Sequence, residues 1–155
     1  MGGVGNMALL EQPLTAFFAS RRCSGRAIRA AMDWAEEQGR CKIPLIGGFH
    51  SPLEKSVLEV VLAADSPVVI VVARDVEHAR FPLSWRRAMQ SGTVAVIGMN
   101  DAGKRLTREK AALRNDWAAK RAVHIVVAFA QAEGNLAYQA SRWQQAGYAV
   151  SFLAS

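Results

Sequence analysis

Short runs rich in β-branched and aromatic residues alternate with amphipathic stretches along most of this chain. The runs predict strands at 14–19, 43–46, 68–73, 94–97, 123–129 and 149–153, and the stretches predict helices at 25–38, 52–64, 82–90, 107–121 and 136–146. Regular alternation of this kind is typical of βα units around a parallel sheet. We therefore expect an α/β fold of three layers, α/β/α, with a doubly wound, mostly parallel sheet of about six strands.

The size of the chain fits one such domain. It has 155 residues, 51% of them hydrophobic, which is enough for a sizeable core. We expect this domain to span residues 14–155 and residues 1–13 to form a loose N-terminal tail. No apolar run reaches the roughly 18 residues of a membrane span, so we expect no membrane contact. Cys23 and Cys41 match no zinc-binding spacing and are typical of free thiols in a reducing compartment, which predicts a cytoplasmic protein without a metal.

One segment stands out as an anion site. In Lys42–Lys55, KIPLIGGFHSPLEK, an apolar strand runs into paired glycines and then into a helix start. Gly47 and Gly48 allow close backbone approach and positive φ, while Ser51 and Glu54 have the spacing of a capping box. Because backbone N–H groups at a helix N-terminus attract negative charge, this loop predicts a bound anion, most often a phosphate.

The charge of the chain also favours an anionic partner. The net charge is +6, and most of the excess lies between residues 104 and 121. Within this segment we predict a nucleic-acid patch of Lys104, Arg105, Arg108 and Lys110. A basic, solvated helix face is the plainer interpretation of the same residues.

The loops after the strands are the expected ligand sites, since right-handed crossovers place them at one edge of the sheet. The loop after the first strand carries Arg21 and Arg22 and ends at Ser24, which precedes a helix. Guanidinium groups bind phosphate through paired hydrogen bonds, so we expect both arginines to contact a phosphate. The alternative is pairing with a surface carboxylate.

Four segments match motifs of a known family in order and spacing. Ala19–Ser24 is similar to its Gly-Ser-Arg-x-x-Ser, Ile46–Ser51 to its Ser-Gly-Gly loop, Leu113–Asn115 to its Arg-Arg-Asn, and Ala132–Leu136 to its Lys-Ser-Gly-Ser-Leu turn. From Leu14 to Leu153 the chain thus resembles the Rossmann-like domain of DNA-processing protein A (DprA/Smf). That domain belongs to the superfamily that includes the Lonely Guy enzymes.

The resemblance implies a phosphate-bearing ligand, either single-stranded DNA, as in DprA, or a nucleotide, as in the Lonely Guy branch. It implies no cofactor. The implied ligand contacts come from the matched segments: Ser20, Arg21, Arg22, Ser24, Gly47, Gly48, Phe49, His50, Ser51, Arg114, Asn115, Gly134 and Asn135. The chain departs from the family at Ala19, which replaces the first glycine, and at residues 49–53, which replace Ala-Arg-Gly-Ile-Asp. A DprA usually also carries flanking domains that this sequence lacks, so the resemblance implies a stand-alone, divergent relative.

Three function classes stay open at this point. The first is a DprA-like binding module without chemistry of its own. The second is a nucleoside-monophosphate phosphoribohydrolase of the Lonely Guy type, in which Glu54, near the position of the catalytic acid of those enzymes, would do the chemistry; its capping-box spacing explains Glu54 equally well. The third is a nucleotide-sensing or structural subunit, and for this fold we expect a homodimer.

Other motifs carry less. Residues 98–104 satisfy G-x-x-x-x-G-K, but Arg105 stands where a P-loop needs Ser or Thr, so we interpret them as a basic loop. His50 can donate to a phosphate or act as a general acid, or it can be an exposed loop residue. Trp85, beside two arginines, can stack on a base or pack in the core.

Overall fold

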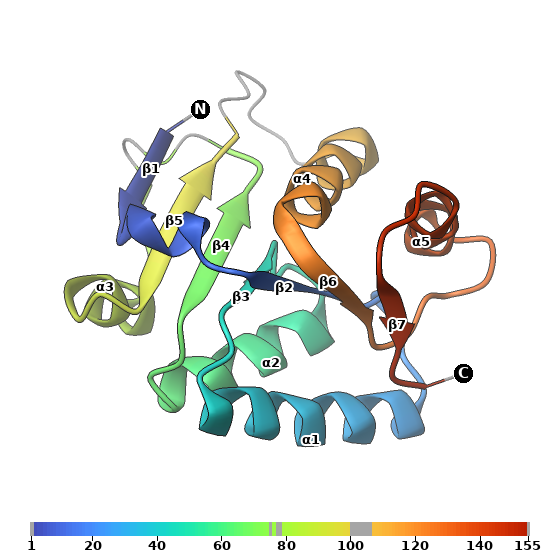
Figure 1. Ribbon diagram of the computed structural model, residues 1–155, viewed down its shortest axis with the longest axis horizontal. Coiled ribbons are helices and arrows are strands. Elements are labelled where there is room, and N and C mark those ends of the chain that lie inside the picture. Colours follow the sequence, from blue (N-terminus) through green and yellow to red (C-terminus); the bar gives the residue numbers. More distant parts are fainter. Residues whose placement is uncertain (1, 75, 77–78, 100–106, 155) are drawn as a thin grey trace.

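The computed structural model describes residues 2–74, 76, 79–99 and 107–154. Within these residues seven strands form one sheet in the order β1-β5-β4-β3-β2-β6-β7 (Figure 1). Only β1 is antiparallel to its neighbour; every other pair is parallel. The strands are β1 (Gly2–Gly5), β2 (Leu14–Phe18), β3 (Leu45–Gly47), β4 (Val68–Val72), β5 (Val94–Gly98), β6 (Ala122–Val127) and β7 (Val150–Phe152).

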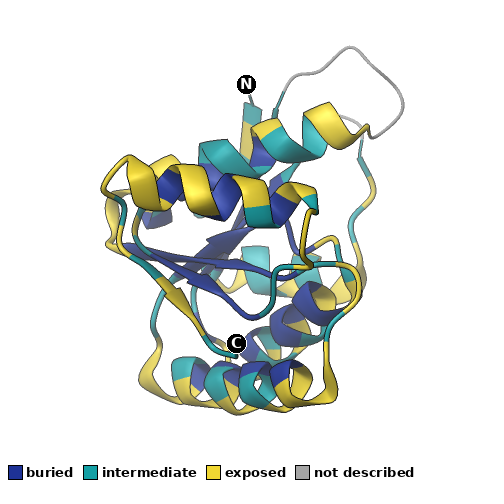
Figure 2. Cartoon of the chain, turned by 90° about the vertical axis from the view of Figure 1, so that its right-hand side faces the viewer, coloured by how far each residue is buried: buried dark blue, intermediate teal, exposed yellow. Residues whose placement is uncertain are grey.

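Helices cover both faces of this sheet. On one face lie α1 (Gly25–Cys41), α2 (Pro52–Ala63) and α3 (Leu83–Gln90), and on the other η1 (Met7–Glu11), α4 (Arg108–Arg121) and α5 (Asn135–Gln145). Alternate residues of the central strands face the two cores, so Val68 and Ile70 pack toward α1 and α2 whereas Val69 and Val71 pack toward η1, α4 and α5. Figure 2 shows the buried sheet between the two helical layers.

The predicted α/β/α architecture is confirmed, and each expected strand and helix is present with ends that differ by a few residues. The reason is local. β4 is apolar at every position, as a strand buried on both faces must be, and α1 and α2 begin at the serine caps Ser24 and Ser51. Trp34 and Trp143 pack in the two cores, where they lie 5.0 Å from Phe17 and 4.9 Å from Phe18 between ring centroids.

The expectation of a loose N-terminal tail is wrong. Gly2–Gly5 form β1, an edge strand paired with β5, and the 3-10 helix η1 that follows buries Leu9. Gly5 has φ +90°, and a Cβ there would lie 2.3 Å from the carbonyl oxygen of Val94. Because this strand is built largely from glycine, it lacks the β-branched pattern that identifies the other strands.

The order of the strands decides where the functional edge lies. From β2 the chain adds β3, β4 and β5 on one side and then returns to add β6 and β7 on the other. The direction therefore reverses between β2 and β6, and ligands of open α/β sheets bind beyond the carboxyl ends of strands near such a reversal. Among the described helices, none has the length and apolar character to cross a membrane.

Candidate functional site

Glu54 fastens two loops together at the carboxyl edge of the sheet. Its Oε2 accepts a hydrogen bond of 2.9 Å from the backbone N–H of Ala19, at the end of β2. Its Oε1 accepts bonds of 2.9 and 3.1 Å from the N–H groups of His50 and Ser51, and the capping box with Ser51 is complete. The side chain is buried. Both carboxylate oxygens thus hold backbone, which gives Glu54 a structural function.

The paired glycines matter because they lack a side chain, and not because they adopt a positive φ. Neither Gly47 nor Gly48 has a positive φ; Phe49 takes that conformation instead, with φ 48°. The Phe49 ring is buried in the core, which offsets the strain of this conformation. A Cβ on Gly48 would lie 2.2 Å from Nε of Arg114, so the missing side chain makes room for the guanidinium.

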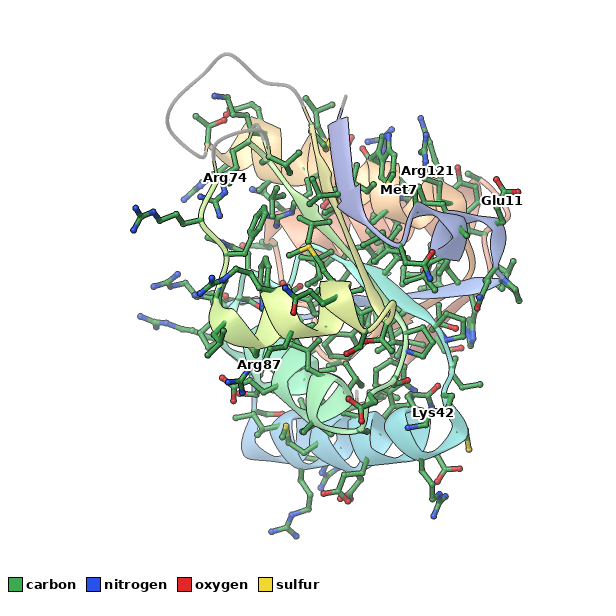
Figure 3. All side chains as sticks on the ribbon, turned by 90° about the vertical axis from the view of Figure 1, so that its left-hand side faces the viewer. Met7, Glu11, Lys42, Arg74, Arg87 and Arg121 are labelled. Carbon is green, nitrogen blue, oxygen red and sulfur yellow. The ribbon has the colours of Figure 1, made fainter. Side chains whose placement is uncertain are left out.

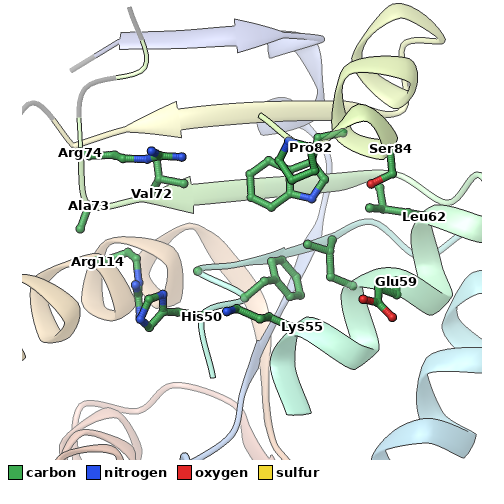
Figure 4. Close-up of a pocket in the computed structure, with 14 residues that line it drawn as sticks. His50, Lys55, Glu59, Leu62, Val72, Ala73, Arg74, Pro82, Ser84 and Arg114 are labelled. Atoms are coloured by element: carbon green, nitrogen blue, oxygen red, sulfur yellow. The ribbon is translucent and has the colours of Figure 1, made fainter. Parts of the chain in front are cut away.

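Arg114 is the buried cation of this edge. It belongs to α4, on one face of the sheet, yet it lines a pocket between elements of the other face, so its side chain passes over the end of β3 beside Gly48 (Figure 4). It is 6% exposed. Its Nη2 donates a bond of 3.4 Å to Oδ1 of Asn115, whereas its Nε has no hydrogen-bond partner.

The charge of Arg114 is not matched by an ion pair. Among the described residues, no carboxylate oxygen lies within 4.0 Å of its guanidinium. Burial lowers the pKa of Arg114, and the more distant negative charge of Glu54 opposes that shift. An arginine stays protonated even so. The edge therefore holds a desolvated positive charge, and its buried Nε has no hydrogen-bond partner.

A pocket of about 640 Å³ opens beside Arg114. This volume lies in the range of small-molecule sites. Its lining is formed by Gly48, Phe49, His50, Lys55, Leu58, Glu59, Leu62, Val72, Ala73, Arg74, Pro82, Ser84, Trp85 and Arg114. In Figure 4, His50, Arg74 and Arg114 lie toward one end, and Glu59, Leu62 and Ser84 toward the other. The pocket is basic where it meets the sheet edge and mainly apolar between α2 and α3.

The pKa of His50 reflects the positive charges at the basic end of the pocket. Partial burial lowers the pKa of this imidazole, and the positive charges of Arg114, Lys55 and Arg21 lower it further, while Glu54 raises it. The free protein at neutral pH thus holds His50 mainly in its neutral form. An anion that offsets the three cations would raise this pKa.

The loop after β2 is tied to the loop after β6 across the reversal point. The Ser20 N–H donates to the carbonyl oxygen of Phe129 at 2.9 Å, and Ser20 Oγ accepts from the N–H of Gln131 at 2.8 Å. Ser24 caps α1 through a bond of 3.1 Å from the N–H of Ala27. The two serines therefore have structural partners.

The predicted contacts fall into two groups along this edge. Gly48, Phe49, His50 and Arg114 line the pocket, next to Gly47 and Ser51. A second group lies outside the pocket lining and follows the edge past β2 toward the start of α5: Ser20, Arg21, Arg22, Ser24, Gly134 and Asn135. In this second group Arg21, Arg22 and Asn135 are exposed, and Gly134 begins α5 without a side-chain cap.

Asn115 accepts the hydrogen bond of Arg114 and also contacts α5. Its Nδ2 donates to Oε1 of Gln139 at 3.4 Å, and Gln139 donates in turn to the carbonyl oxygen of Ala112 at 2.9 Å. These bonds join α4 to α5. Asn115 therefore lies beside the arginine as a link between the two helices.

Half of the predicted nucleic-acid patch can be placed. Arg108 and Lys110 lie in the first turn of α4, where Arg108 is exposed and Lys110 half-buried. Lys104 and Arg105 lie outside the described residues, as does most of the segment 98–104. The patch therefore stays a prediction.

Several pocket residues were missed by the sequence analysis. Lys55, Leu58, Glu59 and Leu62 have the i, i+3, i+4, i+7 spacing of one helix face, a signal that the sequence offered. Arg74 (Figure 3) follows β4, at the carboxyl edge of the sheet. Their common site became visible only when α2, α3 and the end of β4 were placed together.

Metal and thiol chemistry find no support in the described part of the chain. It holds no group of three or more His, Cys, Asp and Glu side chains that could bind a metal. Both cysteines are free. Burial, together with the negative charge of Glu54, raises the pKa of the Cys23 thiol, and its Sγ donates to the carbonyl oxygen of Ser20. This thiol is therefore held in its unreactive, protonated form.

No protein-family model and no curated protein sequence matches the chain, but solved structures do. DNA processing protein A (DprA) from Streptococcus pneumoniae matches with a TM-score of 0.77 and 17% identity, over 97% of this chain and 53% of that one. The single-stranded DNA-binding DprA from Helicobacter pylori matches with a TM-score of 0.75 and 13% identity, over 97% and 69%. The molybdenum cofactor carrier protein of Chlamydomonas reinhardtii matches with a TM-score of 0.63 and 9% identity, over 93% and 78%.

These likenesses establish the fold. The chain has the Rossmann-like fold of the DprA structures, which confirms at that level the resemblance found in the sequence. It spans about half the length of the Streptococcus pneumoniae protein.

Proposed function

We propose that this chain binds single-stranded nucleic acid through its phosphates, without chemistry of its own, at the edge formed by the Arg21 and Gly48 loops. The observation that carries the proposal is Arg114, a buried arginine that lines the pocket and has no carboxylate within ion-pair distance among the described residues. A charge removed from water is costly unless it is paired. A bound phosphate would supply the missing counter-charge.

The surroundings of Arg114 favour a phosphate over other anions. Lys55 and His50 lie beside it in the same pocket, and α2, a helix of 12 residues, begins directly after His50 and Ser51. Positive charge from these side chains then converges on one place, whereas the N–H groups of His50 and Ser51 at the start of the helix are already bound by Glu54. The planar guanidinium can donate two hydrogen bonds to phosphate oxygens.

A single strand of nucleic acid fits this edge better than an isolated phosphate does. Arg21 and Arg22 are exposed outside the pocket, on the loop next to the one that carries His50, so basic groups continue past the pocket along the sheet edge. One of the solved structures of this fold, the Helicobacter pylori DprA, binds single-stranded DNA. We extend that ligand class to the present chain as a proposal, with a free nucleotide as the other ligand to test.

The hydrolase hypothesis is less well supported. A catalytic acid must reach the sugar or the leaving base, but both oxygens of Glu54 already accept backbone N–H groups. Glu54 does not line the pocket, and among the described lining residues the one carboxylate, Glu59, is exposed. We therefore propose binding and not hydrolysis, and we keep the expected homodimer as a proposal that light scattering tests.

The experiment is a fluorescence-anisotropy titration of a labelled single-stranded oligonucleotide at low and high salt, with AMP as competitor. We expect salt-sensitive binding that weakens about 10-fold or more in Arg114→Met and also weakens in Arg21→Ala. Arg29→Met is the matched control, because it removes an exposed arginine from the middle of α1. Oligonucleotide binding that is unchanged in Arg114→Met, or no binding at any salt, would overturn the proposal. Full displacement of the oligonucleotide by AMP would indicate that the ligand is a free nucleotide and not single-stranded nucleic acid.

A further inference from the structure

We infer that the apolar end of the pocket receives a nucleobase of the ligand, and that Glu59 makes it prefer bases that carry an exocyclic amino group. This inference rests on the proposed function, since the phosphate at Arg114 sets the position of the base. It adds base selectivity to a site that the proposed function assigns only to phosphate.

The shape of the pocket supports a flat occupant next to the phosphate. One wall is the face of α2 with Glu59 and Leu62, and the opposite wall is the start of α3, with Pro82 and Ser84 (Figure 4). Leu58 of α2 and Trp85 of α3 also line the pocket. The end of β4 lies between the two walls. This groove is continuous with the space beside Arg114, so a phosphate and its attached base can occupy one cavity.

Packing against Phe81 fixes the orientation of the Trp85 ring, on which a base could stack. Its ring is half-buried and packs against Phe81, with 5.8 Å between ring centroids and 20° between ring planes. The Arg74 guanidinium lies 5.8 Å from the Phe81 centroid and extends the same stack. An indole fixed in this way loses little freedom when a base packs on it, and aromatic stacking accepts any base.

Selectivity comes from the sign of the charges. The cations of the pocket lie toward Arg114, whereas the carboxylate of Glu59 lies toward the apolar end (Figure 4). Among the described residues Glu59 has no hydrogen bond or ion pair. A carboxylate only accepts hydrogen bonds, so it favours an amino group and disfavours a carbonyl oxygen at the same position. Ser84, on the facing wall, can donate or accept and so adapts to either.

The test compares CMP with UMP, whose rings differ at C4, an amino group against a carbonyl oxygen, and at the adjacent N3, an acceptor in CMP and an N–H donor in UMP. Isothermal titration calorimetry measures both, with ribose 5-phosphate as the ligand without a base. We expect the wild-type chain to bind CMP about 10-fold more tightly than UMP, and Glu59→Gln to lose most of that difference. Glu36→Gln, an exposed position on α1, is the matched control.

The stacking residue has its own readout. We expect Trp85→Ala to weaken CMP and UMP binding alike by about 10-fold and to leave ribose 5-phosphate binding unchanged. Trp85→Leu repeats the measurement with a larger apolar side chain, and thermal unfolding confirms that each variant folds.

The failures can be told apart. Equal affinities for CMP, UMP and ribose 5-phosphate, all dependent on Arg114, would overturn the base site and leave the proposed function intact. No binding of ribose 5-phosphate, of any nucleotide or of the oligonucleotide would overturn both. A CMP preference that persists in Glu59→Gln would exclude Glu59 as its source.

Discussion

Replacing Arg114 by methionine separates stability from function, because the native guanidinium is buried without an ion pair among the described residues. Methionine has a similar reach and needs no counter-charge. Exchange of buried charged groups for apolar ones of similar size is often neutral or stabilises proteins by about 1–4 kcal/mol. Against this stands the long bond to Asn115, 3.4 Å, whose loss costs about 0.5–1 kcal/mol.

The net expectation is that Arg114→Met leaves the free energy of unfolding nearly unchanged or raises it by up to about 3 kcal/mol. For a chain of this size the upper value corresponds to a rise in Tm of about 10 °C. In the same variant the charge-assisted bonds to the phosphate are absent, which weakens oligonucleotide binding by about 10- to 150-fold. The variant is thus expected to be as stable as the wild-type chain or more so, and defective only with ligand.

Thermal unfolding with and without the oligonucleotide measures both effects. The wild-type chain should unfold at a higher temperature when ligand is added, because ligand binds only the folded state, and Arg114→Met should show little or no such shift. A variant that is clearly less stable than the wild-type chain, yet binds the oligonucleotide with unchanged affinity, would refute the reasoning. Arg114 would then be a structural residue.

Gly48→Ala should displace the Arg114 guanidinium, since the new Cβ would lie 2.2 Å from its Nε. Fluorescence anisotropy should then show oligonucleotide binding that is about 10-fold weaker. Gly25→Ala is the control and should bind the oligonucleotide normally, because a Cβ there meets open space. Glu54→Gln should lower the free energy of unfolding by about 1–3 kcal/mol in urea, because an amide N–H₂ would then face a backbone N–H; unchanged stability would argue against the structural function of Glu54. Binding of a phosphate ligand should strengthen as the pH falls from about 8 to about 5. The reason is that the lowered pKa of His50 keeps this side chain neutral in the free chain, whereas a bound anion favours its protonation. The same pH series in His50→Gln should lose that part of the pH dependence, and an identical profile would show that His50 does not take up the proton.

The fold could be predicted from the sequence because its signals are local. A strand such as β4 that is buried on both faces must be apolar throughout, and the capping box at Ser51 sets the start of α2 whatever lies around it. β1 escaped prediction for the opposite reason. Its glycines carry no strand preference, and their order comes from backbone hydrogen bonds to β5, about 90 residues away in the chain.

The site was predicted in pieces. Gly48 and Arg114 were both singled out from motifs, but their contact joins β3 and α4 across the sheet edge and follows from the strand order alone. The pocket between α2 and α3 was not foreseen, since Trp85 and Lys55 look like ordinary helix residues until the two helices lie side by side. The sequence by itself determined the layers and the edge where a ligand would bind, because periodicity and caps act over a few residues. Only the tertiary structure decided that Arg114 is buried without an ion pair among the described residues, because burial and missing ion pairs depend on residues far apart in the chain.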